Sequence, residues 1–287
     1  MIKKSIALAL ATMIACAHAT DSKAAALSPT QIIDSAPAED WRFVAPENML
    51  VLTLPTGQVL MEMNTRLTPA HHHRLTELAA KHFYKDLSMY RFVEGFVAQG
   101  GAGEETTQVP TLKQEFVKHT DKRLALDIVV NEQDGYAARS GFLDGFAVAQ
   151  NAQGTQTWQT HCIGALGMAR GNEIDSGTSE FYVVIGHAPR YLDRNITVFG
   201  RVLAGMEHLQ RLQRPGSTDK PFNKITDMVL ASQLPVEQQP QVKVMRTDSD
   251  SFAALVEARK NRPESWFLTT PNYIDTCAMQ VPTITGG

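Results

Sequence analysis

Residues 48–64 contain two runs in which apolar and polar positions alternate. Every second position is apolar in residues 50–54 and again in residues 59–63, with the sequence PTG between them at 55–57. A period of two on both sides of a Pro/Gly turn predicts a β-hairpin.

The pattern changes to a helical period in residues 66–84. Thr68 suits an N-cap, Pro69 suits the first helical position, and apolar residues recur at helical spacing from Leu75 onward. The histidines at 71–73 suggest a metal site, but adjacent helix positions point in different directions and cannot converge on one ion. We therefore interpret them as a polar first turn, and expect neither a metal nor another cofactor.

The rest of the chain is mostly short apolar runs separated by Gly- and Pro-marked turns. Strands are predicted at 122–131, 163–171, 179–186, 195–203, 224–232 and 242–247, and helices at 207–212 and 248–262. Residues 133–158 are rich in Gly, Asn and Gln, and we expect long loops there with one strand or hairpin inside. Many short strands with few helices indicate an antiparallel sandwich or barrel.

The N-terminus has the layout of a secretory signal peptide. Lys3 and Lys4 precede an apolar run over residues 6–16, and the small residues Ala17 and Ala19 follow it. We predict a signal peptide at 1–19 and a periplasmic or secreted protein. The alternative is a lipid anchor on Cys16. Residues 20–47 are predicted to be a loosely ordered linker, with a short helix near residues 29–33.

Composition and charge narrow the function classes. The 287 residues are 43% hydrophobic with a net charge of −3, which is typical of an ordinary globular protein. Both signs are scattered along the chain and no basic block occurs, so we exclude nucleic acid as a partner. The apolar run near the N-terminus is shorter than the ~20 residues that a membrane span needs. No other run is long and apolar enough either.

Two cysteines, Cys162 and Cys277, would remain after export. In an oxidising compartment they could form a disulfide that ties the C-terminal tail to the main body, or both could stay as buried free thiols. His161 beside Cys162 suggests a thiol hydrolase, but neighbours on a strand point to opposite faces and rarely act as a pair.

Three segments, in order, resemble the cyclophilin family of peptidyl-prolyl isomerases. FYKDLSMYRFVEGFVAQGG (83–101) is similar to its aromatic-Arg and Gly-Phe-apolar-x-Gln-Gly-Gly signature. GMARGNEIDSGTSEFYVVIG resembles its Met-Ala and Gly-x-Ser-Gln-Phe-Phe-Ile block, and YLDRNITVFGRVLAGME resembles its Trp-Leu-Asp and Val-Phe-Gly block. The resemblance covers residues 48–232.

The resemblance implies a mainly β fold, an eight-stranded antiparallel barrel closed by two helices. It places the barrel domain at 48–235 and leaves 236–287 as a C-terminal extension with a strand and a helix. It implies an isomerase that acts on proline-containing polypeptides, and we expect a monomer. Carried over by position, Arg91 is the catalytic residue. The implied substrate-binding residues are Phe96, Val97, Tyr182 and Leu192 around the proline ring, Gln99 near the arginine, and Ala169 and Arg170 at the residue before proline.

Five positions depart from the family pattern and affect the expected site. Glu180 replaces a glutamine, Arg170 an asparagine, Ile196 a histidine, Tyr191 a tryptophan and Val97 a methionine. Glu180 could form an ion pair with Arg91 and so lower the turnover of the enzyme. Tyr191 puts tight cyclosporin binding in doubt. An alternative function is therefore a proline-peptide binding or scaffold protein of the cell envelope without catalysis. The long interval from Arg91 to Tyr182 also predicts an insertion in residues 117–160.

Overall fold

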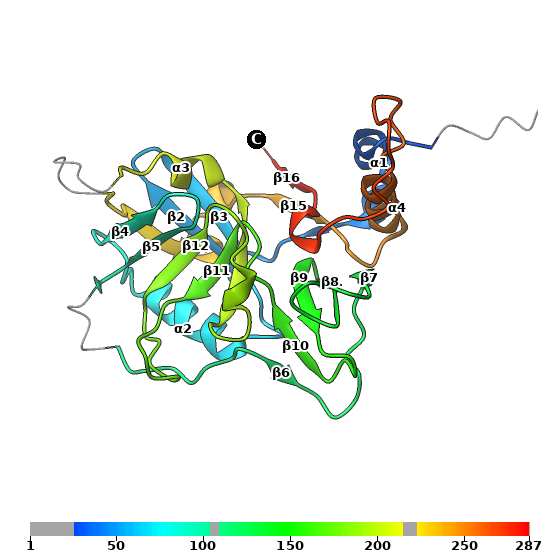
Figure 1. The fold of residues 1–287 in the computed structure, drawn as a ribbon. Helices are drawn as coiled ribbons and strands as arrows, with labels where there is room; N and C mark the ends of the chain where they lie inside the picture. The colour runs from blue at the N-terminus through cyan, green and yellow to red at the C-terminus, as the bar shows by residue number, and fades with distance from the viewer. Residues whose placement is uncertain (1–25, 104–108, 215–222, 287) are drawn as a thin grey trace, which may run out of the picture.

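The structure is a computed structural model that describes residues 26–103, 109–214 and 223–286 (Figure 1). The predicted signal peptide at 1–19, including Cys16, lies outside the described residues. Within the described ranges the chain forms three antiparallel sheets, with four α-helices around them.

The main sheet has eight antiparallel strands and forms a half-barrel. Its strands, in sheet order, are β14 (Asp227–Leu230), β2 (Met49–Leu54), β3 (Gly57–Met63), β13 (Val198–Ala204), β11 (Ala165–Met168), β12 (Phe181–Val184), β5 (Val97–Gly101) and β4 (Ser88–Val93). The predicted hairpin is β2–β3, which pairs Met49 with Glu62 and Leu54 with Gly57. The edge strands approach each other through a bridge between Ser88 and Lys224. The predicted mainly β fold with eight antiparallel strands is confirmed, as a half-barrel.

Two helices cover opposite ends of this sheet. α2 (Pro69–Ala80) lies at one end and α3 (Met206–Gln210) at the other (Figure 1). Leu75 and Leu78 of α2 and Leu209 of α3 are buried in the main core, together with the inward side chains of the strands. The apolar stripe on each helix thus joins the interior of the half-barrel, because burying it removes hydrocarbon surface from water.

The three histidines of α2 contact different partners. His71 is buried, with Nδ1 at 2.7 Å from Glu115 Oε2, whereas His72 Nε2 lies 3.0 Å from Asn48 Oδ1. His73 is exposed. Within the described residues no group of three or more His, Cys, Asp or Glu side chains is arranged to hold a metal ion.

The insertion between β5 and β11 forms a second sheet. Its order is β6 (Lys118–His119), β10 (Gln156–Gln159), β9 (Phe146–Gln150), β8 (Arg139–Leu143) and β7 (Ile128–Asn131). The expectation of long loops with one strand or hairpin over 133–158 is therefore wrong, since three strands lie there. The predicted strand at 122–131 is shorter, and is limited to β7.

The N-terminal and C-terminal segments fold together. β1 (Trp41–Phe43) and β16 (Thr283–Thr285) flank β15 (Val242–Met245) in a third sheet. α1 (Pro29–Ser35) and α4 (Asp250–Asn261) lie side by side beyond it (Figure 1). The short helix predicted near residues 29–33 is therefore confirmed as α1, whereas the loosely ordered linker expected around it carries the strand β1. Phe252 of α4 packs edge-on against Phe142 of β8, which joins this unit to the second sheet.

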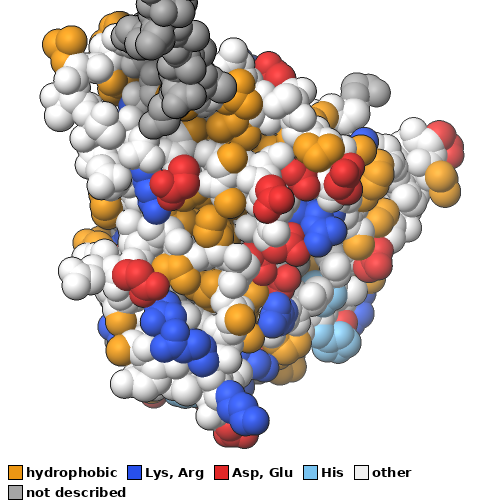
Figure 2. Space-filling model, turned by 90° about the vertical axis from the view of Figure 1, so that its right-hand side faces the viewer, with side chains coloured by type: hydrophobic (Ala, Val, Ile, Leu, Met, Phe, Trp, Pro, Cys, Tyr) orange, Lys and Arg blue, Asp and Glu red, His pale blue; other side chains and the backbone are white. Residues whose placement is uncertain are grey.

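Several short 3₁₀ helices connect these elements. They are η1 (Ala38–Asp40), η2 (Pro46–Asn48), η4 (Arg190–Leu192), η5 (Ala231–Gln233), η6 (Val236–Gln238) and η7 (Thr276–Ala278). Among the residues that the structure describes, no helix has the length and apolar character needed to cross a bilayer. Both acidic and basic side chains occur on the face shown in Figure 2, with hydrophobic side chains between them.

A disulfide joins Cys162 to Cys277, whose Cα atoms are 4.8 Å apart. Cys162 precedes β11 of the main sheet, and Cys277 lies in η7 of the C-terminal segment. The two cysteines line a cavity of about 460 Å³ between the main sheet, the second sheet and the tail. Because Cys162 is oxidised here, it is not a free thiol nucleophile.

Candidate active site

Arg91, Gln99 and Tyr182 lie in a row across three neighbouring strands of the main sheet. Arg91 of β4 is paired with Gln99 of β5, which is paired in turn with Tyr182 of β12. Directly paired residues project from the same face of an antiparallel sheet. Their strand neighbours Ala98 and Phe181 are buried in the main core, on the inner face. Since successive side chains alternate, the row lies on the outer face.

The Arg91 guanidinium is exposed and is oriented by the amide beside it. Arg91 Nη1 donates to Gln99 Oε1 at 3.2 Å, and Gln99 Nε2 donates to the Tyr90 hydroxyl at 2.6 Å. The contact with Gln99 uses one of the five N–H donors of the guanidinium. Burial raises the pKa of Tyr90 to about 12, and the Glu180 carboxylate adds to the rise. Tyr90 is therefore protonated at neutral pH.

A register shift in β4 explains why Tyr90 and Arg91 are both exposed. The pairing of β4 with β5 is irregular between Ser88 and Arg91. Met89 and Phe92 on either side are both buried in the main core. A bulge of this kind breaks the period of two and re-aims a side chain. The sequence reasoning missed Tyr90 as a site residue, and its place before the arginine in the aromatic-Arg motif was the available signal.

An apolar cluster forms the floor beside the row. Its members are Val97, Ala165, Tyr182, Val184 and Val198, with Phe96, Ala169 and Ile196 partly buried against them. The structure thus brings together five of the predicted substrate-binding positions: Phe96, Val97, Ala169, Tyr182 and Ile196. Tyr182 faces Gly167 across the β11–β12 pair. A Cβ on Gly167 would overlap the Tyr182 ring, so the absence of a side chain there makes room for the ring.

Two predicted residues lie apart from this cluster. Tyr191 and Leu192 are in η4, where Tyr191 is 64% exposed and Leu192 is half-buried. Within the described residues the apolar cluster includes neither of them. The floor is thus built by β5, β11, β12 and β13 and by residues next to them.

Glu180 is turned toward the backbone of β5. Its Oε1 accepts a hydrogen bond from the Ala102 N–H at 2.8 Å, and the carboxylate packs directly over Gly101. In the described part of the chain no ion pair joins Glu180 to Arg91, so the pairing that the sequence suggested is absent from the structure. The other oxygen, Oε2, is buried, and the carboxylate is close enough to the Tyr90 hydroxyl to help raise its pKa.

Arg170 is fixed to the loops around it. Its Nε donates to the Asn195 carbonyl at 3.0 Å, and its Nη1 donates to the Gly171 carbonyl at 2.8 Å. The guanidinium carbon also lies 5.5 Å from the Phe116 ring centroid. These contacts join the loop after β11 to the loop before β13, so Arg170 shapes the rim of the site.

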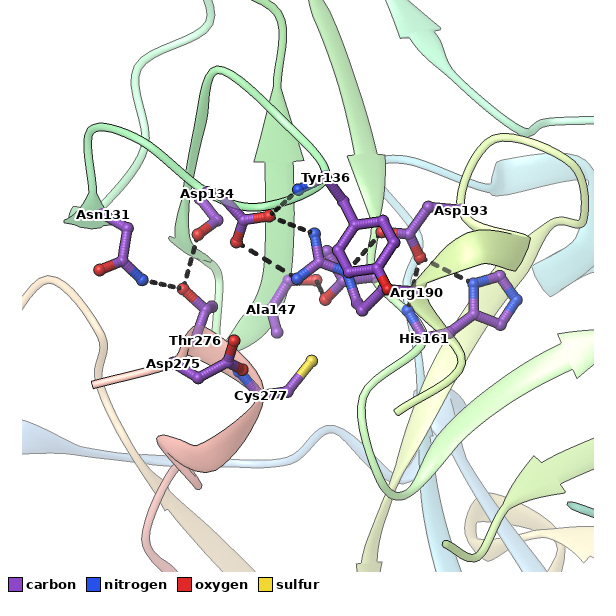
Figure 3. Close-up of polar contacts among 12 residues, drawn as sticks. Asn131, Asp134, Tyr136, Ala147, His161, Arg190, Asp193, Asp275, Thr276 and Cys277 are labelled. Carbon is purple, nitrogen blue, oxygen red and sulfur yellow. Dashed lines mark hydrogen bonds and ion pairs between the residues drawn. The ribbon is translucent and has the colours of Figure 1, made fainter. Parts of the chain in front are cut away.

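A buried polar network continues from Tyr182 into the second sheet. His161 lies between Tyr182 and Asp193. Arg190 connects Asp193 to Asp134 (Figure 3). Burial disfavours the charge of Arg190, but Asp193 and Asp134 outweigh it and raise the pKa of the guanidinium. In the sequence His161 stands out only beside Cys162, because its partners Asp193 and Tyr182 come from residues further along the chain.

Fold and site together define a class of protein: a β half-barrel with an exposed, amide-oriented arginine beside an apolar floor on its outer face. A family model described as "Cyclophilin type peptidyl-prolyl cis-trans isomerase/CLD" matches residues 49–232. The chain therefore belongs to the cyclophilin-type peptidyl-prolyl cis-trans isomerase family.

Similar proteins are named as peptidyl-prolyl cis-trans isomerases or as cyclophilins. A "Probable peptidyl-prolyl cis-trans isomerase" of Brucella suis is 24% identical over 185 residues, covering 64% of this chain and 81% of that protein. "Peptidyl-prolyl cis-trans isomerase B" of Bacillus subtilis is 26% identical over 158 residues, covering 54% and 83%. The crystal structure of cyclophilin AquaCyp293 from Hirschia baltica has a TM-score of 0.68 and 26% identity, covering 85% of this chain and 93% of that one. The chain is thus an enzyme of the isomerase class.

Proposed function

We propose that this isomerase accelerates X–Pro isomerisation in exported polypeptides and so assists their folding, with Arg91 as its catalytic residue. The row of Arg91, Gln99 and Tyr182 carries this proposal, because it sets a permanent cation beside an apolar floor on one face of the sheet. Phe96, Val97 and Tyr182 would hold the proline ring. Ala169 would contact the residue before proline.

To catalyse this rotation, the protein must bind the proline ring and orient one hydrogen-bond donor toward the X–Pro amide. The X–Pro bond rotates slowly because its partial double bond imposes a barrier of about 20 kcal/mol. In the twisted state the amide nitrogen is pyramidal and basic. An arginine that donates to this nitrogen, or to the carbonyl oxygen, stabilises the twisted state more than the planar one. Gln99 limits the rotamers of the guanidinium, so less entropy is lost when it acts.

Glu180, which stands where the family has glutamine, does not block this mechanism. Its carboxylate accepts from the Ala102 N–H and packs over Gly101, so it does not hold the Arg91 side chain. The alternative function is a scaffold that binds proline peptides without isomerising them. It rests on the departures from the family pattern at Glu180, Arg170 and Ile196. Ile196 lies in the apolar cluster and Arg170 is bound to loop carbonyls, so both would shape the floor and rim.

A protease-coupled assay on an X–Pro peptide tests the role of Arg91. We expect Arg91→Ala to lower kcat/KM by about 100-fold, since removing one oriented donor to a transition state costs on the order of 10²–10³. Arg66→Ala is the matched control, because Arg66 is an exposed arginine paired with Asp144 on another part of the surface. Equal activity in the wild type and Arg91→Ala would reject the assigned mechanism. Peptide binding without acceleration in the wild type would favour the scaffold alternative.

Export is supported by the predicted signal peptide and by the disulfide, because disulfides persist in oxidising compartments. We expect the protein recovered from its cells to be periplasmic or secreted and to begin at Thr20. Mass spectrometry of the intact chain checks this directly. A lipid-modified Cys16 would support the anchored alternative, and a cytoplasmic protein retaining residues 1–19 would contradict export.

A further inference from the structure

His161 is a buried titratable side chain to which the isomerase mechanism assigns no role. It is 0% exposed, and its ring is nearly parallel to that of Tyr182, with centroids 6.3 Å apart and planes 15° apart. Both ring nitrogens have partners: Nδ1 lies 2.9 Å from Asp193 Oδ1, and Nε2 lies 2.9 Å from the Tyr182 hydroxyl. The ring therefore bridges a carboxylate and a residue of the proposed proline floor.

The surroundings of Asp193 fix how this ring is protonated. Asp193 Oδ1 also accepts from the His161 backbone N–H at 2.9 Å, and its Oδ2 accepts from Arg190 Nε at 2.6 Å. Arg190 is held in turn by Asp134, at 3.1 Å from Nη2 to Oδ1 (Figure 3). A carboxylate paired with a guanidinium is ionised and only accepts, so His161 Nδ1 must carry a proton and donate it. In the neutral ring Nε2 is then an acceptor.

Tyr182 supplies the matching donor. Burial, together with the charge of Asp193, raises the pKa of its phenol well above the usual value, so the hydroxyl keeps its proton. The hydroxyl is directed at His161 Nε2, and the ring sits over Gly167. The family block has phenylalanine where this chain has Tyr182. Leaving a buried hydroxyl without a hydrogen-bond partner is unfavourable, so the tyrosine needs an acceptor at this position.

We infer that His161 is a positioning residue of the isomerase: its Nε2 holds the Tyr182 hydroxyl and thereby fixes the ring that forms the floor of the proline pocket. This inference rests on the proposed function, because it assigns the floor to substrate proline. His161 does not touch the substrate. It acts through Tyr182, while Asp193, Arg190 and Asp134 orient its imidazole.

Two substitutions separate the two hydrogen bonds of the imidazole. His161→Asn puts an amide near the place of Nδ1, so it keeps a donor for Asp193 but does not reach Tyr182. His161→Gln extends to the place of Nε2 and offers its amide oxygen to the Tyr182 hydroxyl. We expect His161→Asn to raise KM for an X–Pro peptide about tenfold, and His161→Gln to stay within about threefold of the wild type. Either variant should change kcat by less than about threefold.

Repeating the His161→Asn and His161→Gln substitutions in a Tyr182→Phe background shows whether their effect on KM depends on the Tyr182 hydroxyl. A phenyl ring needs no acceptor, so the Asn and Gln variants should then have equal KM. A KM difference that persists in the Tyr182→Phe background, or equal KM values for the two variants in the wild-type background, would overturn the inference.

A measurement on the unaltered protein applies even if the variants fold poorly. Nitrogen-15 NMR of the histidines reports which ring nitrogen carries the proton. The inference requires the Nδ1–H form of His161, and a neutral Nε2–H ring would overturn it. If the wild type neither binds nor isomerises X–Pro peptides, the proposed function fails. That result is distinct from the NMR and KM outcomes, which concern only how Tyr182 is held.

Discussion

At the scale of single residues, the site depends on the fit of the Tyr182 ring against Gly167. The two residues are directly paired across β11 and β12, and the ring occupies the space that any side chain at 167 would fill. Because a packed interior tolerates little added volume, this contact determines where the proposed proline floor lies.

Gly167→Ala should displace the Tyr182 ring into the pocket. We expect about a tenfold fall in kcat/KM for an X–Pro peptide, equivalent to ~1.4 kcal/mol, since one added carbon cannot coexist with the rigid ring. A loss of about 1–3 kcal/mol in the free energy of unfolding should accompany it. The control is Gly135→Ala, where an added Cβ has no heavy atom within 4 Å. If the two variants had the same kinetics, the fit of Tyr182 would not control the pocket.

Several positions singled out by the sequence motifs lie together in the structure. Five predicted positions converge in the apolar cluster, and Arg91 and Gln99 are in contact. Tyr90 and His161 were missed as site residues because their roles come from partners contributed by other strands and loops. Spacing along the chain does not report such partners.

At the scale of elements, strands with strong alternation were predicted well, and so was the presence of an insertion at 117–160, but most of the strands inside it were not. The β2–β3 hairpin and α2 follow their patterns closely. In the second sheet the turn between β8 and β9 is Asp144-Gly145, both with positive φ, of 52° and 87°. This is the two-residue Asp-Gly turn typical of hairpins, so the signal was present. High Gly, Asn and Gln content around it obscured the alternation.

The N-terminal segment shows a second limit of local patterns. α1 has only seven residues and β1 only three, so neither is stable on its own. They form because α4 and β15 provide apolar surface and a strand edge from the other end of the chain. The short helix near residues 29–33 was predicted, but β1 was not, because its pairing partner β15 comes from the other end of the chain.

At the scale of the whole molecule, the disulfide connects the C-terminal segment to the main sheet, and a hydrogen bond connects it to the second sheet. Cys277 is bonded to Cys162, and Thr276 beside it contacts Ser140 of the second sheet at 2.7 Å. His161, next to Cys162, reaches the Tyr182 hydroxyl. The described parts of the chain are thus tied together close to the proposed site.

Reduction of the disulfide should lower the stability of the whole molecule. The bond closes a separation of 115 residues, and opening a loop of this size costs about 2–5 kcal/mol by releasing unfolded-state entropy. We expect Tm to fall by roughly 5–15 °C with reductant, and Cys277→Ser to reproduce the fall without it. Alkylation followed by mass spectrometry confirms that both thiols became free. A Tm unaffected by complete reduction would show that packing alone holds the tail.

The central claim is that Arg91 catalyses rotation of a bound X–Pro bond. NMR exchange spectroscopy of one proline peptide, with the wild type and with Arg91→Ala, measures binding and rotation in the same sample. The account predicts that both proteins bind the peptide with similar affinity, while only the wild type produces strong cis–trans exchange peaks. Exchange peaks of equal strength with both proteins would contradict it.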